Sequence, residues 1–180
     1  MNGHIPETFA QFEDDFRKKM EKVLPEPFKD EYECLSVLAE NPERSVFIVR
    51  EKNTGLKRIL KVTSETNSNS ARSEYKFLSS LDHPAIPKAL RFEKIEDKGI
   101  LIREYVEGET LAERVSRAGP FSVRETLELA RQVCDVLSFL HLQSPPIIYK
   151  DIKPQNIILS SDVKIHLIDF GISREYDPTK

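Results

Sequence analysis

The sequence predicts an α+β fold in which a strand-rich part comes first and a helix-rich part follows. Five short, apolar-rich runs have the length and composition of β-strands, and they occupy residues 34–38, 45–51, 57–63, 90–96 and 100–106. One helix interrupts these strands, because apolar residues recur at three- and four-residue steps between residues 70 and 81. The pattern becomes helical after Glu107-Gly108, and this order predicts two lobes joined by a hinge near residues 104–108.

Local signals place the boundaries of these elements. Asn53-Thr54-Gly55 predicts a hairpin turn between the second and third strands, and His83-Pro84 follows the end of the first helix. In the second part a short helix is expected at residues 110–118. A longer one is expected at residues 122–142, because Ser122 is a good N-cap with Glu125 three positions later.

Three segments follow from this pass along the chain. Residues 1–27 form an N-terminal helical extension, residues 28–106 the first lobe, and residues 107–180 the second lobe. The extension carries an amphipathic helix at residues 8–24, capped by Thr8. Its apolar face is expected to pack on the next domain, and a dimer contact is the alternative.

Composition excludes several classes of function. The chain has 180 residues, 39% of them hydrophobic and 32% charged, and a net charge of −3, which does not suit a nucleic-acid-binding protein. No apolar run has membrane-spanning length and no signal peptide is visible, so we expect a cytoplasmic protein, although an anchor in a longer parent chain stays open. Cys34 and Cys134 both lie in apolar runs, and each is expected to be a buried, reduced thiol.

Two charged residues occupy positions where the pattern expects an apolar one. The apolar stripe of the helix at residues 70–81 includes Glu74, and Lys61 lies within the apolar third strand. A buried charge needs a partner, so we expect these two side chains to form an ion pair. The alternative, an inward Glu74 whose oxygens reach water, stays open on the pattern alone.

A cluster of polar side chains near the C-terminal end indicates phosphoryl transfer. Asp151, Lys153 and Asn156 crowd into a loop stiffened by Pro154, and Asp169 ends the next apolar run. An acid could orient an attacking hydroxyl, a lysine could neutralise a γ-phosphate, and an amide could bind a metal ion.

These motifs together resemble those of eukaryotic-type serine/threonine protein kinases. The stretch 149–156 resembles the catalytic loop, and Asp169-Phe170-Gly171 resembles the magnesium motif at the expected spacing. Lys61 and Glu74 fall where the family has its strand lysine and helix glutamate, and the resemblance covers roughly residues 30–175. It implies a five-stranded antiparallel N-lobe with one helix, then an incomplete helical C-lobe. The residue pair Tyr149-Lys150, directly before Asp151, favours a bacterial origin.

The resemblance also implies ATP and Mg²⁺ as ligands and a role for each matching residue. Catalysis would fall to Lys61, Glu74, Asp151 and Lys153, and metal binding to Asn156 and Asp169. The nucleotide would be bound by Lys61, Val46, Ile59, Glu104, Val106 and Ile158, with Glu104 and Val106 offering backbone groups to adenine. Leu78, Tyr149 and Phe170 would belong to an apolar column between the lobes.

Several positions depart from the family pattern. The family's three loop glycines are replaced by Ala39, Asn41 and Arg44, which predicts weaker nucleotide binding, although Arg44 could replace amide contacts with charge. Ile59 stands where alanine is usual, so the adenine pocket is expected to be tight. Arg103 stands at the gatekeeper position, which is usually apolar or threonine.

The chain stops at Lys180, soon after Gly171, and we therefore expect a C-lobe without the family's peptide-binding helices. An uncovered apolar face on the helix at residues 122–142 would favour self-association or a partner chain. Its expected members are Leu127, Ala130, Val133, Cys134, Val136, Leu137, Phe139, Leu140 and His141. Three functions remain open: an active protein kinase, a catalytically weak binding module, and a small-molecule kinase of the aminoglycoside or choline type.

Overall fold

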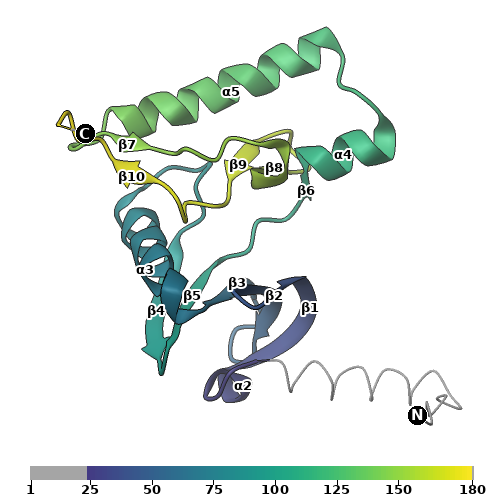
Figure 1. Cartoon of the computed structure of the whole chain (residues 1–180). Helices are drawn as coiled ribbons and strands as arrows, with labels where there is room; N and C mark the ends of the chain where they lie inside the picture. Colours follow the sequence, from purple (N-terminus) through teal and green to yellow (C-terminus); the bar gives the residue numbers. More distant parts are fainter. Residues whose placement is uncertain (1–23, 180) are drawn as a thin grey trace, which may run out of the picture.

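The computed structural model describes residues 24–179, so the predicted helix at residues 8–24 lies outside the described part except for Leu24. A short helix, α2 (Phe28–Glu31), leads into the first strand. Figure 1 shows the chain rising from this helix and the large sheet at one end to the long helix α5 (Val123–His141) at the other. The helix α3 (Glu65–Ser80) lies between them.

The five predicted strands form one antiparallel sheet, which confirms the predicted N-lobe. They are β1 (Tyr32–Glu40), β2 (Arg44–Glu51), β3 (Lys57–Thr63), β4 (Ala89–Ile95) and β5 (Lys98–Glu104), in the order β1-β2-β3-β5-β4. Each lies within two residues of its predicted bounds. The predicted turn at residues 53–55 is also present, with the Gly55 amide donating to the Glu51 carbonyl and Gly55 at a φ of +74°.

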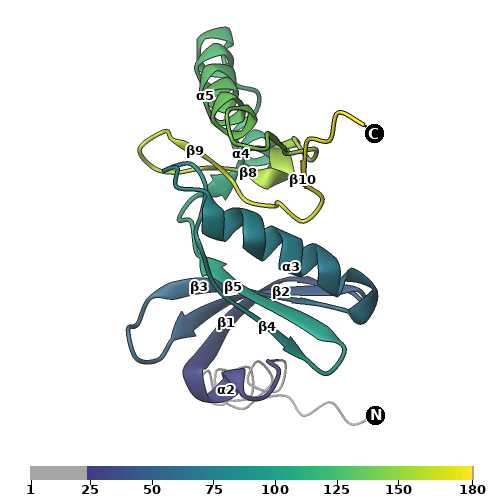
Figure 2. The same cartoon turned by 90° about the vertical axis from the view of Figure 1, so that its left-hand side faces the viewer.

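The helix α3 begins five residues earlier than predicted, at Glu65, and Ser64 is its N-cap residue. The sequence of its first turn is polar throughout, so no apolar periodicity marks it. Its later residues Ala71, Leu78 and Leu81 are buried as the stripe predicted. In Figure 2 the helix crosses one face of the sheet, while α2 lies beyond the opposite face.

The helical part contains α4 (Leu111–Ala118) and α5, and both begin with the capping arrangement that serine or threonine and glutamate can make. Ser122 accepts from the Glu125 amide while the Glu125 carboxylate accepts from the Ser122 amide, so the predicted cap is confirmed. Thr110 and Glu113 cap α4 in the same way.

Several short strands complete this part. A three-stranded sheet contains β6 (Glu109–Thr110), β8 (Ile157–Leu159) and β9 (Ile165–Leu167), and a turn of 3₁₀ helix, η1 (Pro154–Asn156), precedes β8. A two-stranded ribbon pairs β7 (Ile147–Ile148) with β10 (Arg174–Glu175). Together they hold the polar loop at residues 149–156 between strands at both of its ends.

Two hydrophobic clusters support the fold. One lies under the sheet and includes Phe28, Phe47 and Leu60. The other joins α3 to the helical part and includes Leu78, Leu140, Tyr149 and Phe170. The predicted apolar column is therefore present, with the Tyr149 and Phe170 rings meeting edge-on at 4.9 Å between centroids.

Two expectations about the burial of α5 residues are wrong. Val136 and Leu140 were expected on an uncovered face, but both are buried in the second cluster. Val133, Leu137 and Phe139, expected on the same face, are partly buried and pack against that cluster. Cys34 is buried as predicted, whereas Cys134 is exposed because it lies on the side of α5 that faces away from that cluster. Within residues 24–179, no helix is both long and apolar enough to cross a membrane.

Candidate active site

A cleft of about 670 Å³ lies between the large sheet and the loop that carries η1 and β8. Its walls come from both parts of the chain: Val46 and Ile59 from the sheet, Val106 from the connection, and Ile158 from β8. A second cavity of about 340 Å³ continues from it and contains Asp151. Arg44, Lys61, Lys153 and Asp169 line both cavities.

Lys61 is the centre of the charged network in this cleft. Its Nζ lies 2.5 Å from the Glu74 Oε2 atom and 3.1 Å from the Asp169 Oδ1 atom. The predicted pair between Lys61 and Glu74 is therefore confirmed, and Glu74 does not reach water, since it is only 1% exposed. The lysine joins β3, α3 and the segment after β9 through a single ammonium group.

Local structure explains why these charges meet. Strand β3 is central, with Lys61 opposite Val46 of β2 and Leu101 of β5. Glu74 lies on the buried stripe of α3, so its carboxylate faces the sheet. Its second oxygen, Oε1, is buried without a hydrogen-bond partner among the described residues, which leaves Lys61 as its main stabilising contact.

A further contact fixes α3 against the segment 169–171. The Ser70 hydroxyl donates to the Gly171 carbonyl at 2.6 Å, and the Gly171 amide donates to the Asp169 Oδ1 atom at 3.1 Å. A Cβ on Gly171 would lie only 3.2 Å from both the Ser70 hydroxyl and that Asp169 oxygen, so little room is left for a side chain there. Helix and segment are thus held together in the arrangement in which Lys61 reaches both carboxylates.

Asp169 keeps its charge in spite of its position. Burial acts to raise the pKa of its carboxyl, but the charge of Lys61, the Gly171 amide and the charge of Arg44 outweigh it, so the pKa lies below its ordinary value. The carboxylate is therefore ionised throughout the neutral range.

The loop at residues 149–156 brings the second acid into place. Asn156 donates from Nδ2 to the Asp151 Oδ2 atom at 2.7 Å, and the Lys153 ammonium lies 2.8 Å from the same oxygen. Lys150 adopts a φ of +66°, a left-handed conformation that non-glycine residues seldom adopt, and it turns the chain directly before Asp151. The loop thus presents Asp151, Lys153 and Asn156 together, as predicted from their spacing.

The turn between β1 and β2 is closed on itself. The Asn41 side-chain oxygen accepts from the amides of Glu43 and Arg44, at 3.0 and 2.8 Å. The Asn41 amide donates in turn to the Arg44 carbonyl at 2.9 Å. Backbone amides that a glycine-rich loop would offer to phosphate are therefore already engaged here.

Arg44 itself points into the cleft. Its Nη1 atom lies 3.2 Å from the Asp169 Oδ2 atom, on the opposite side of the carboxylate from Lys61. The sequence placed Arg44 near the phosphates but gave no sign of this pair, because 125 residues separate the partners.

Arg103 is a buried cation in the cleft wall. The residue is 7% exposed, and its Nη1 atom donates to the Glu104 carbonyl at 3.1 Å. Burial lowers the pKa of its guanidinium, while the charges of Glu74 and Asp169 act in the opposite direction. Glu104 does not line the cleft itself, although its carbonyl retains a second lone pair beside the one that Arg103 uses.

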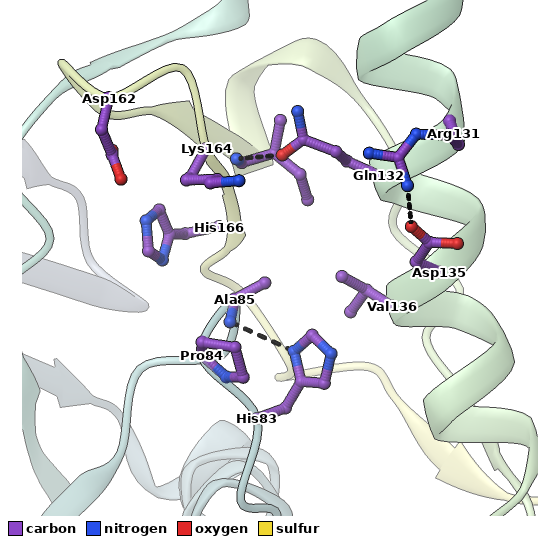
Figure 3. A pocket seen from close by; sticks show the side chains of 11 residues that line it. His83, Pro84, Ala85, Arg131, Gln132, Asp135, Val136, Asp162, Lys164 and His166 are labelled. Carbon is purple, nitrogen blue, oxygen red and sulfur yellow. Dashed lines mark hydrogen bonds and ion pairs between the residues drawn. The ribbon is translucent and has the colours of Figure 1, made fainter.

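Another hollow, of about 460 Å³, lies on a different side of the molecule between α5, β9 and the turn after α3 (Figure 3). Its polar groups serve local structure: His83 accepts from the Ala85 amide, and the Gln132 Oε1 atom accepts from the Ile165 amide. Arg131 pairs with Asp135 along α5. The Gln132 contact joins α5 to β9, and the other two contacts lie within the turn after α3 and within α5.

Comparison with known proteins settles the family. A family model described as the protein kinase domain matches residues 44–180. The chain belongs to the protein kinase family. Sperm motility kinase 2B of Mus musculus is 30% identical over 155 residues, 85% of this chain and 32% of that protein. Protein kinase 3 of Dictyostelium discoideum is 33% identical over 165 residues, 87% of this chain and 18% of that protein.

A bacterial relative is also similar. Serine/threonine-protein kinase PrkC of Bacillus subtilis (strain 168) is 34% identical over 108 residues, 60% of this chain and 16% of that protein. This kinase chain therefore spans less than a third of the length of each of these three relatives. Since they come from animal, amoebal and bacterial sources, the bacterial origin stays a prediction.

The residues of the kinase cleft fit a magnesium ion. Asn156 and Asp169 both line the cleft and offer amide and carboxylate oxygens, the ligand types that Mg²⁺ prefers. Asn156 engages Asp151 through its nitrogen, so its side-chain oxygen is not part of that contact. The Asp169 carboxylate, however, already has a cation on each of its oxygens.

Proposed function

We propose that this chain transfers the γ-phosphoryl group of ATP to a serine or threonine hydroxyl of a protein. The observation that carries the proposal is the Lys61 ammonium, which contacts the Glu74 and Asp169 carboxylates beside the loop that presents Asp151. Residues 28–106 would form the nucleotide-binding lobe and residues 107–180 the part that carries the catalytic loop. A cytoplasmic location accords with this activity.

In this proposal the predicted site residues bind the nucleotide and the magnesium ion. Val46, Ile59 and Ile158 pack on the base, and Val106 and the Glu104 carbonyl offer it backbone hydrogen bonds. Lys61 holds the α- and β-phosphates, and Glu74 fixes the position of that lysine. Magnesium, held by Asn156 and Asp169, would neutralise charge on the phosphates when bound.

The acceptor hydroxyl is managed by the catalytic loop. Asp151 accepts the hydroxyl proton as the oxygen attacks the γ-phosphorus atom and the bond to the bridging oxygen breaks to release ADP. The Asn156 amide holds the carboxylate in place. Lys153 shares the same carboxylate oxygen and can stabilise the charge on the transferred phosphoryl group.

Phosphate transfer from radiolabelled MgATP to a generic protein substrate tests the proposal. Asp151→Asn should reduce transfer by at least about 100-fold, since general-base contributions are typically of that size, while nucleotide binding is retained. Asp97→Asn, at an exposed turn, is the matched control and should leave the rate unchanged.

The alternative is a binding module that holds a nucleotide without transferring phosphate. The engaged amides of the turn at residues 41–44 favour it, because they cannot position a phosphate chain as free amides would. ATP binding with no transfer above background by the unaltered chain would support this alternative. Phosphorylation of a small amino alcohol or aminoglycoside, and of no protein, would instead indicate a small-molecule kinase.

We further propose that the chain self-associates through the outer face of α5. Val123 and Leu127 are 78% and 66% exposed there, and Cys134 continues the same side of the helix. Sedimentation should show a dimer that Leu127→Glu converts to a monomer. Leu56→Glu, at another exposed leucine far away in the β2–β3 turn, should not change the assembly. A monomer at every concentration tested would contradict this proposal.

A further inference from the structure

The cleft holds more positive charge than its ligand-binding acids require. Four cations line it, Arg44, Lys61, Arg103 and Lys153, together with the three carboxylates of Glu74, Glu113 and Asp169. Four positive and three negative side chains leave this group with a net charge of +1. Without Arg44 and Arg103, the remaining two lysines and three carboxylates would carry −1, which would repel a polyanion.

Arg44 contacts the same carboxylate that would hold a divalent ion. The Asp169 carboxylate has Lys61 at Oδ1 and Arg44 at Oδ2, so its charge is already matched on both sides. The Arg44 side chain is 41% exposed, which allows its guanidinium to turn from the carboxylate toward an incoming ligand. It also lines both cavities, and therefore lies where the base-binding cleft meets the catalytic loop.

The backbone amides near Arg44 are not free to bind phosphate. Amides of Glu43 and Arg44 donate to the Asn41 side chain, so a phosphate chain would find side-chain donors and not main-chain ones at this turn. A guanidinium offers two parallel N–H groups to a phosphate, which compensates in charge and in hydrogen bonds for the engaged amides.

We infer that this cleft binds the triphosphate of ATP without a divalent metal ion, with Arg44 moving from Asp169 to the phosphates. Arg103 supports the same binding from the wall by offsetting the buried charge of Glu74. The inference rests on the proposed nucleotide site but not on phosphate transfer, because a cleft can bind ATP without metal and still need metal to react.

Calorimetric titration with ATP, once in excess EDTA and once in excess Mg²⁺, tests this inference. For the unaltered chain the two Kd values should agree within about threefold, a difference below 1 kcal/mol. Arg44→Gln keeps a polar, though shorter, side chain and removes its charge. This variant should weaken binding in EDTA by about tenfold or more while binding in Mg²⁺ changes little, since metal can then reach Asp169 freely.

Arg50→Gln is the matched control, because Arg50 lies on the same strand and pairs with Glu33 at the surface. It should bind like the unaltered chain in both buffers. ATP binding by the unaltered chain only when Mg²⁺ is present would overturn the inference and leave the proposed function intact. Equal binding by Arg44→Gln in EDTA would also overturn it. Absence of binding in both buffers would reject the nucleotide site itself.

Discussion

At the scale of single residues, the site depends on charges that compensate one another inside the protein. Glu74 is almost completely buried and has one oxygen without a hydrogen-bond partner among the described residues, so Lys61 is its main stabilising contact. The same lysine and Arg44 hold Asp169 in its ionised form. Each of these charges is stabilised by its partners, so substitution of a single one should destabilise the protein.

Lys61→Met should lower the free energy of unfolding by about 3–5 kcal/mol, because it leaves Glu74 as a buried charge without its partner. Urea titration followed by circular dichroism measures this loss. Removing both charges with Lys61→Met and Glu74→Leu together should restore most of it. Lys57→Met removes an exposed pair with Glu107 and should cost less than about 1 kcal/mol. Equal losses in Lys61→Met and Lys57→Met would contradict this account.

At the scale of elements, the connection from the sheet to β6 depends on one glycine. Gly108 has a φ of +148°, and a Cβ there would lie 2.4 Å from the Leu159 carbonyl oxygen and 2.8 Å from an Ile158 methyl group. Both neighbours belong to β8, which pairs with β6 and forms one wall of the cleft. Any side chain at this position must therefore push the wall away.

Gly108→Ala should destabilise the chain by roughly 2–4 kcal/mol, through backbone strain and a contact that cannot relax, and it should weaken ATP binding. Gly119→Ala is the control, because Gly119 also has a positive φ, +79°, but open space around it. That variant should cost only about 1–2 kcal/mol and leave binding unchanged. Thermal unfolding and ATP titration of both variants separate the two effects, and similar values for both would count against the role of Gly108.

Elements with long, regular patterns could be predicted from the sequence, and short or polar ones could not. The strands of the large sheet and the cap at Ser122 agree with their predicted positions because alternation and capping are local signals. The first turn of α3 is polar throughout, and β6, β7 and β10 have two residues each, too few to show a period. The Arg44–Asp169 pair depends on the fold bringing β2 to the segment after β9, which no local pattern encodes.

At the scale of the whole molecule, the strand-rich and helical parts are joined by the second hydrophobic cluster and by individual hydrogen bonds. The Leu167 amide donates to the Ala85 carbonyl at 2.9 Å, and Ser70 contacts Gly171. His83 and His166 lie around the hollow in Figure 3, where the turn after α3 meets β9. Both imidazoles belong to the joint between the two parts, so their protonation bears on how firmly the parts are held.

Stability should therefore decline as the pH falls from about 7.5 to about 5.5, around the ordinary pKa of histidine. Burial lowers the pKa of both imidazoles, despite the nearby carboxylates of Asp135 and Asp162. Below the ordinary pKa the unfolded chain then binds more protons than the folded one, which favours unfolding. Urea midpoints across this range measure the effect. His83→Gln combined with His166→Gln should flatten the profile, and an unchanged slope would show that other groups cause it.

An inhibitor designed for this cleft would meet a buried cation where Arg103 forms the wall. Apolar substituents placed there would cover a guanidinium without replacing its lost hydration, which is unfavourable. A carboxylate or another strong acceptor would instead receive charge-assisted hydrogen bonds from the donors that Glu104 does not use. Anionic or acceptor-bearing compounds should therefore bind this kinase more tightly than relatives with an apolar residue at the same position. A single side chain, Arg103, would determine which inhibitors are selective.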